Sequence, residues 1–205
     1  MQTERRTIAT ASAFTIIELI VVIAIILVLA GLILATSSYV HNKGARSRAE
    51  AEIAAMSAAL ENYKADNGVY PRGPATPTTI GSVTIPANVT DNLDAKTMGN
   101  PNRTTNPTYG ETSLYLYTLL SGDSTGNRNA TGKGYMQFKP SMLLPAGGTG
   151  TVIAISDPFG NSYGYSTANQ SNPSNGYNPT FDLWSTAGAV DTSNSPSSTA
   201  WIKNW

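Results

Sequence analysis

Residues 14–35 read FTIIELIVVIAIILVLAGLILA, and this stretch decides how the rest of the chain can fold. Residues 19–35 contain no charged side chain, whereas 13% of the whole chain is charged. At 1.5 Å per residue, a helix over residues 14–35 is about 33 Å long, enough to cross a hydrocarbon core of about 30 Å. The stretch therefore predicts a transmembrane helix.

One acidic residue, Glu18, interrupts the apolar stretch four residues after Phe14. A carboxylate at membrane depth costs about 2.5–3.5 kcal/mol on insertion scales, and such residues usually have a partner or a function. Glu18 is therefore the first candidate site residue.

In the segment before the helix, the possible cleavage site and the apolar run stand in an unusual order. Residues 1–13 read MQTERRTIATASA, a short polar segment with a basic pair at Arg5 and Arg6. In a secretory signal peptide the small-residue cleavage site follows the apolar run. Here the small residues 11–13 precede it, so cleavage after Ala13 would leave the apolar helix on the mature chain.

Residues 13–19, AFTIIEL, resemble the cleavage and methylation motif of the type IV prepilins. The resemblance implies that a prepilin peptidase removes the leader 1–13 by cutting between Ala13 and Phe14, and methylates the new amine of Phe14. The family usually has glycine where this chain has Ala13. The resemblance also implies a filament in which Glu18 of one subunit neutralises the Phe14 amine of a neighbour and fixes the register between the two subunits. The alternative is a plain signal anchor whose Glu18 side chain reaches the membrane surface.

Residues 36–67 lack proline and are rich in alanine and glutamate, so the helix is expected to continue to Asn67. Gly68 suits the left-handed position after a helix end, and Pro71 prevents the helix from resuming. Apolar residues spaced three or four apart predict that one face packs on a sheet, with a coiled-coil seam as the alternative. This stripe comprises Ala45, Ala49, Ile53, Met56, Leu60 and Tyr63. The opposite face is expected to be solvated and is assigned Arg46, Arg48, Glu50, Glu52, Glu61 and Lys64.

Residues 68–205 predict one globular domain of short strands and long loops. The proline-rich segment 72–112 is expected to be mostly loop, with strand pieces around Ile80 and at 83–85. Residues 113–120 are compatible with a short helix or a strand, and the resemblance to the pilin-like family favours the helix. Residues 135–138 and 151–155 are assigned to strands, with an extended loop as the alternative for 135–138. The fold class is therefore α+β: a long N-terminal helix, membrane half plus amphipathic half, packed on a small antiparallel sheet with long loops, as in the pilin-like fold.

Three stretches resemble the major pseudopilin of the type II secretion system. Residues 157–165, DPFGNSYGY, and 181–185, FDLWS, are similar to its DPWGNPY…FDLYSxG signature, and residues 61–71, ENYKADNGVYP, to its ALxxYKLDNGxYP. The alternation of side chains in the first two stretches predicts a turn followed by two antiparallel strands. The resemblance implies a structural subunit of the pseudopilus, a helical filament of many copies that helps to drive protein export.

The same resemblance implies partners and a location. It implies a bacterial inner-membrane protein with a single membrane pass, a C-terminal domain in the periplasm, and assembly into a periplasmic or surface filament. Its partners would be further copies, prepilin peptidase, the inner-membrane secretion platform and the minor pseudopilins. A formal net charge of zero does not suggest a nucleic-acid surface. The alternatives are a pilin or minor pilin of a type IV pilus, for adhesion or DNA uptake, and a signal-anchored periplasmic binding protein.

Calcium is the one cofactor to consider. In the resembling family, the loop after FDLYSxG holds calcium through aspartates and carbonyl groups. Here residues 186–200 contain one carboxylate, Asp191, whereas calcium prefers six to eight oxygens. We therefore expect at most a weak site at Asp191, and expect Trp201 and Trp205 to hold this region by packing on the sheet. The chain has no cysteine and one histidine, and it lacks paired-acid and phosphate-binding motifs, so no enzyme is predicted.

Overall fold

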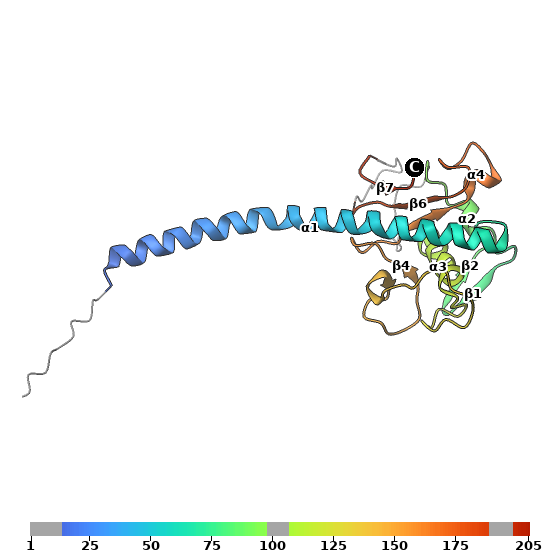
Figure 1. The fold of residues 1–205 in the computed structure, drawn as a ribbon, viewed down its shortest axis with the longest axis horizontal. Helices are drawn as coiled ribbons and strands as arrows, with labels where there is room; N and C mark the ends of the chain where they lie inside the picture. The colour runs from blue at the N-terminus through green and yellow to red at the C-terminus, as the bar shows by residue number, and fades with distance from the viewer. Residues whose placement is uncertain (1–13, 98–106, 189–198) are drawn as a thin grey trace, which may run out of the picture. The chain divides into compact units, whose positions relative to one another are not determined.

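The computed structural model describes residues 14–97, 107–188 and 199–205. The chain divides into two compact units at Lys43 and Gly44, and helix α1 (Ile16–Asn67) contributes to both (Figure 1). The fold combines helices with small antiparallel sheets, so the predicted α+β class is confirmed at this level.

Helix α1 ends where the sequence predicts. Gly68 follows the last helical residue with a φ of 78°, and its N–H donates to the carbonyl of Lys64 at 2.7 Å. This left-handed position favours glycine because a Cβ atom would be strained there.

The second half of α1 packs on the core through the predicted stripe. Ala49, Met56 and Leu60 are fully buried, and Ile53 is 5% exposed. The assignment of Glu52 to the solvated face is wrong, because Glu52 is only 8% exposed. Glu52 follows Ala49 by three positions, so it lies on the same side of the helix as the stripe.

The strands form three small antiparallel sheets. The predicted strand pieces near Ile80 form a hairpin in which Ile80 pairs with Val83. The sheets are β1 (Thr78–Ile80) with β2 (Val83–Ile85), β3 (Leu143–Leu144) with β4 (Ala154–Ile155), and β5 (Gly164–Ser166) with β6 (Asp182–Ser185) and β7 (Ile202–Lys203).

The predicted turn and strand pair after it are confirmed. Residues 157–161 form a tight turn in which the N–H of Asp157 donates to the carbonyl of Asn161 at 2.8 Å. In the next sheet, Tyr165 of β5 lies opposite Leu183 of β6. Strand β7 adds to the other edge of β6, where Ile202 pairs with Ser185.

Helices occupy some places that were assigned to loops or strands. The helix predicted at 113–120 is confirmed as part of α3 (Pro107–Ser121), which begins inside the predicted loop 72–112. The same loop contains α2 (Val89–Asn92). Residues 135–138 are not a strand, and residues 151–155 are strand only at their end. The remaining short helices are η1 (Pro140–Met142) and α4 (Ala168–Ser171).

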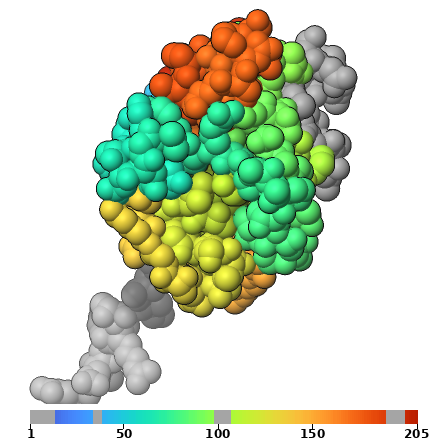
Figure 2. Space-filling model, turned by 90° about the vertical axis from the view of Figure 1, so that its right-hand side faces the viewer, coloured from blue at the N-terminus to red at the C-terminus, as the bar shows by residue number. Residues whose placement is uncertain are grey.

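The main core lies between the second half of α1, α3 and the strands, and segments distant in sequence meet there. Tyr63 near the end of α1 makes an edge-to-face contact with Tyr135, with ring centroids 5.2 Å apart. Figure 2 shows the end of α1 (turquoise) beside the segment that contains Tyr135 (yellow). The largest fully buried apolar side chains of this core are Met56, Leu60, Ile85, Leu114, Leu116, Leu120, Ile155, Tyr163 and Tyr165.

A second, smaller core is built on tryptophan, and in it Trp201 and Trp205 pack on the sheet as predicted. The Trp201 ring stacks on Trp184 of β6 with centroids 5.8 Å apart and planes 9° apart. Trp205 meets the edge of Trp184 at 5.8 Å and stacks on Tyr177 at 4.7 Å. Asn204 joins the tail to β6, because its Oδ1 accepts the N–H of Leu183 at 2.8 Å.

Candidate functional site

The start of α1 is a hydrogen-bonded cap. The hydroxyl of Thr15 donates to Glu18 Oε2 at 2.7 Å, and the N–H of Thr15 donates to the same oxygen at 2.9 Å. In return, the N–H of Glu18 donates to Thr15 Oγ1 at 3.3 Å. This reciprocal arrangement is a capping box, in which a Thr and a Glu three residues later satisfy each other's N–H groups. The Thr-x-x-Glu spacing of this cap is visible in the sequence at residues 15–18.

The first half of α1 exposes a long apolar surface in which Glu18 is the one charged residue. Residues Ile16–Ile33 are long and apolar enough to cross a membrane, and none of this span is buried inside the structure. Phe14 is 82% exposed, and Ile16 and Ile17 are 79% and 68% exposed. An apolar surface of this extent normally contacts lipid or another protein.

Two of the predicted site residues lie within the described chain and two do not. Phe14 and Glu18 lie at the start of α1, where the Glu18 carboxylate binds Thr15. Ala13, before the predicted cut, and Asp191, the predicted calcium ligand, lie outside the described residues. The pairing of Glu18 with an amine on another copy therefore stays a prediction.

Most of the predicted calcium loop, residues 186–200, lies outside the described residues. Across residues 14–97, 107–188 and 199–205, no three His, Asp or Glu side chains are grouped so that they could hold a metal ion. Ser185, which directly precedes this loop, donates its hydroxyl to Asp157 at 2.6 Å, and Asp157 also accepts two backbone N–H groups. Calcium binding at Asp191 stays a prediction from the sequence.

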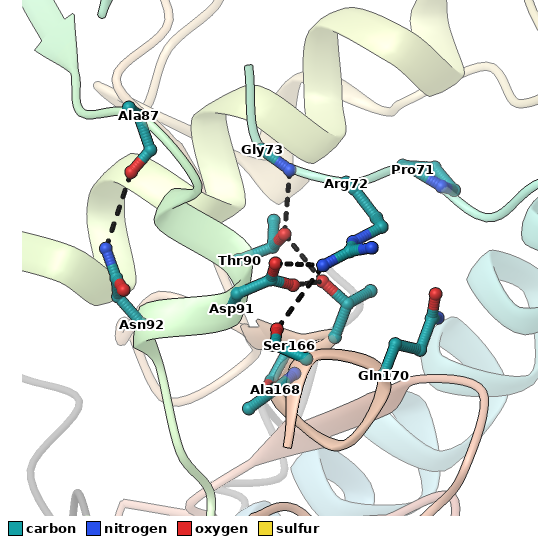
Figure 3. Close-up of polar contacts among 12 residues, drawn as sticks. Pro71, Arg72, Gly73, Ala87, Thr90, Asp91, Asn92, Ser166, Ala168 and Gln170 are labelled. Carbon is teal, nitrogen blue, oxygen red and sulfur yellow. Dashed lines mark hydrogen bonds and ion pairs between the residues drawn. The ribbon is translucent and has the colours of Figure 1, made fainter. Parts of the chain in front are cut away.

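A polar cluster connects the loop after α1 to α2 and to the end of β5 (Figure 3). The guanidinium of Arg72 pairs with Asp91, whose Oδ1 accepts the hydroxyl of Thr167 at 2.6 Å. Thr167 also shares a 2.7 Å hydrogen bond with Thr90, and Thr90 accepts the N–H of Gly73 at 2.8 Å. Because every one of these contacts is internal, the cluster stabilises the loop rather than presenting free groups to a ligand.

A hollow of about 470 Å³ opens beside the end of α3, lined in part by Tyr117, Phe138 and Arg128. Asp123 lies in its wall, but the Asp123 carboxylate accepts the hydroxyls of Tyr117 and Thr125 and three backbone N–H groups. Arg128 is held by the carbonyls of residues 145 and 150. The charged groups of this hollow therefore hold the surrounding loops in place.

Comparisons with models of known protein families, with characterised proteins and with solved structures gave no match. The interpretation of function therefore rests on the sequence motifs and on the geometry at the start of α1.

Proposed function

We propose that this chain is a structural subunit of a type II secretion pseudopilus, processed by prepilin peptidase and polymerised through the first half of α1. The observation that supports the proposal is the exposed apolar helix Ile16–Ile33 with one acid, Glu18, at its start. Such a helix needs lipid before assembly and other helices after it.

The cap at Thr15 gives the proposed assembly a physical sequence of events. Before cleavage, the Glu18 carboxylate is satisfied within its own chain by two donors of Thr15. Cleavage after Ala13 would create a positively charged amine at Phe14, and burial in a helical bundle would then favour its pairing with a carboxylate. Repeating this contact from one copy to the next gives head-to-tail growth into an open helical filament.

The fold of the C-terminal unit is compatible with an outer shell of such a filament. The second half of α1 is fixed to the strands through Ile53, Met56 and Leu60, so each added helix would bring one globular domain with it. We therefore propose the pilin-like arrangement, with the domain in the periplasm. The same helix also supports the alternative function, a pilin of a type IV pilus. A pilin filament would be found on the cell surface, whereas a pseudopilus would support secretion.

The mature N-terminus tests the processing step. Mass spectrometry of the chain purified from membranes should find a first residue Phe14 that carries a methyl group. A functional chain that still carries residues 1–13, or one that begins near Thr36 because a signal peptidase cut after the apolar run, would contradict the proposal.

Replacement of Glu18 tests the assembly step. Glu18→Ala should be cleaved normally and should form few or no filaments, because the Phe14 amine loses its partner at membrane depth. Sheared filaments and secreted enzyme activity are the measurements, with Glu50→Ala as a matched control on the exposed face of the same helix. Filaments of normal amount and length with Glu18→Ala would remove the role assigned to Glu18.

A further inference from the structure

One charged side chain lies among the apolar residues that fix the second half of α1 to the strands. Glu52 is buried, and its Oε2 accepts the hydroxyl of Tyr163, the residue directly before β5, at 2.7 Å. Its Oε1 accepts the Nε–H of Arg48 at 2.7 Å. Tyr163 is fully buried, and burial and the adjacent Glu52 raise the pKa of its phenol, so the hydroxyl stays a donor. This hydrogen bond therefore joins α1 directly to the strand segment across the core.

The apolar stripe of α1 does not by itself define one position along the helix axis. Its residues recur at every turn, so a slide of one turn, about 5.4 Å, replaces each of them by an apolar neighbour. Ala45 would then lie where Ala49 lies, and Met56 where Leu60 lies. Apolar side chains would still face apolar side chains, and the main cost of the slide would be imperfect packing.

The hydrogen bond between Glu52 and Tyr163 does distinguish these registers. A slide of one turn would bring residues 48–49 opposite Tyr163 in one direction and residues 55–56 in the other. These residues are an arginine, two alanines and a methionine, and none of their side chains is a strong hydrogen-bond acceptor. The buried phenol would therefore lose its partner, and a buried polar group without a partner is costly.

Two further polar contacts of this part of α1 can follow such a slide. Arg46 Nη1 donates to the carbonyl of Ala200 at 2.9 Å, and Arg48 Nη2 donates to Ser141 Oγ at 3.1 Å. Both contacts are made by long arginine side chains, which can change rotamer and still reach an acceptor. The contact between Glu52 and Tyr163 lacks this freedom, because both side chains are buried in the core.

We propose that Glu52 is the positioning residue that fixes the axial register of α1 on the strands. Its hydrogen bond to Tyr163 is satisfied at one position of the helix and is lost one turn away in either direction. A single buried polar residue has this effect in coiled coils, where it specifies one register among apolar alternatives. The apolar stripe supplies most of the attraction between α1 and the strands, and Glu52 determines where along its axis the helix is held.

A distance between two spin labels tests this inference, whether or not the chain forms a pseudopilus. The chain has no cysteine, so Ala51→Cys and Thr79→Cys create the only two labelling sites, and both positions are exposed. Ala51 lies about 24 Å before the end of α1, and β1, which contains Thr79, lies near that end (Figure 1). A slide of α1 therefore changes the distance between the labels. Double electron–electron resonance on the full chain in detergent micelles should give one distance when Glu52 and Tyr163 are unaltered.

The decisive variant combines Glu52→Leu with Tyr163→Phe, which removes the hydrogen bond and leaves neither partner unpaired. The labelled variant should unfold in urea at a midpoint close to that of the labelled parent chain. It should also show a second distance, displaced by up to about 5 Å, because one helical turn measures about 5.4 Å. A single, unshifted distance would overturn the proposal, and a lower unfolding midpoint with one distance would show that the bond serves stability alone.

Single substitutions cover the case in which the double variant does not fold. Tyr163→Phe alone removes one hydroxyl and should also show the second distance, and its absence would contradict the role of Glu52. Glu52→Gln keeps an oxygen that can accept the Tyr163 hydroxyl, so it should retain the single distance. A second distance in Glu52→Gln would overturn the proposal as well. Glu50→Leu is the matched control, because it removes a carboxylate from the exposed face of α1 and should retain one distance.

Discussion

At Gly164 of β5 the backbone packs directly against the ring of Trp184. A Cβ atom built on Gly164 would lie 2.2 Å from Cε2 of Trp184, well inside van der Waals contact. The Trp184 ring cannot move away easily, because Trp201 stacks on one side of it and Tyr109 meets its edge at 5.6 Å. The Gly in the Tyr-Gly-Tyr sequence is therefore required by packing.

Gly164→Ala should lower the free energy of unfolding by about 1–3 kcal/mol, because the added methyl group overpacks the tryptophan core. Urea denaturation followed by tryptophan fluorescence measures the loss. Gly44→Ala is the control: it adds the same methyl group within α1, where nothing lies within 4 Å, and should stabilise the chain by about 0.5–1 kcal/mol. Equal stabilities of the two variants would contradict the packing argument.

At the scale of elements, α1 carries both the surface proposed for assembly and the helix face that completes the core. In its second half the buried face is made by one stripe, and Met56 at its centre is fully buried. The outward face of the same half exposes small residues such as Ala51, Ala54 and Ala58.

Met56→Ala should destabilise the globular unit by about 2–5 kcal/mol, because it leaves a cavity between α1 and the strands. Ala58→Ser changes an exposed position two residues away and should alter stability by less than about 0.5 kcal/mol. The measurement is chemical denaturation of both variants beside the unaltered chain. A small effect of Met56→Ala would mean that the second half of α1 does not depend on its buried stripe.

The elements that could be predicted from sequence are those with a local cause. The end of α1 follows from Gly68, the stripe from its periodicity, and the strand pieces that become β1 and β2 from alternating residues on either side of Gly81. The burial of Glu52 could not be predicted, because its partner Tyr163 is 111 residues away in sequence. The start of α3 was missed for a similar reason: prolines mark residues 72–112 as loop, but Pro107 occupies the first helical position, where its missing N–H costs nothing.

The candidate site was predictable in composition but not in geometry. The sequence alone identifies Glu18 as an acid in an apolar helix, since no comparable side chain interrupts residues 19–35. Its hydrogen bonds to Thr15 depend on where α1 begins, and a helix start is one of the least certain boundaries in any sequence.

For the molecule as a whole, two kinds of carboxylate respond oppositely to acid: those whose pKa burial raises and those whose pKa hydrogen bonds lower. Burial raises the pKa of Asp157 and of Asp182, so their contribution to stability is present below the ordinary aspartate value and is lost as pH rises through the folded pKa. Burial acts on Asp91 in the same direction, but the hydrogen bonds from Arg72, Thr167 and Ser171 outweigh it and lower its pKa. The contribution of Asp91 is therefore present above the ordinary value and is lost as pH falls through its folded pKa.

These opposite signs predict a stability maximum on the acid side of neutrality. The free energy of unfolding, measured in urea over a pH series, should rise as pH falls from 7 toward about 4 and should then decrease as Asp91 is protonated. Asp91→Asn should remove much of the decrease at lowest pH, with little effect on the rise above it. A stability that decreases steadily from neutral pH would contradict the assignment of Asp157 and Asp182.

The pairing of β7 with β6 has a practical consequence for anyone who wishes to label this chain. Residues 199–205 supply a strand, a stacked indole and two hydrogen bonds that join the side chain of Asn204 to Phe181 and Leu183 of the FDLWS segment. A fluorescent or affinity tag fused after Trp205 would be attached directly beside these three sets of contacts and would be expected to disturb them. The exposed glycine turn at 147–148, where a Cβ atom on Gly147 meets nothing within 4 Å, is the better insertion point for a reporter.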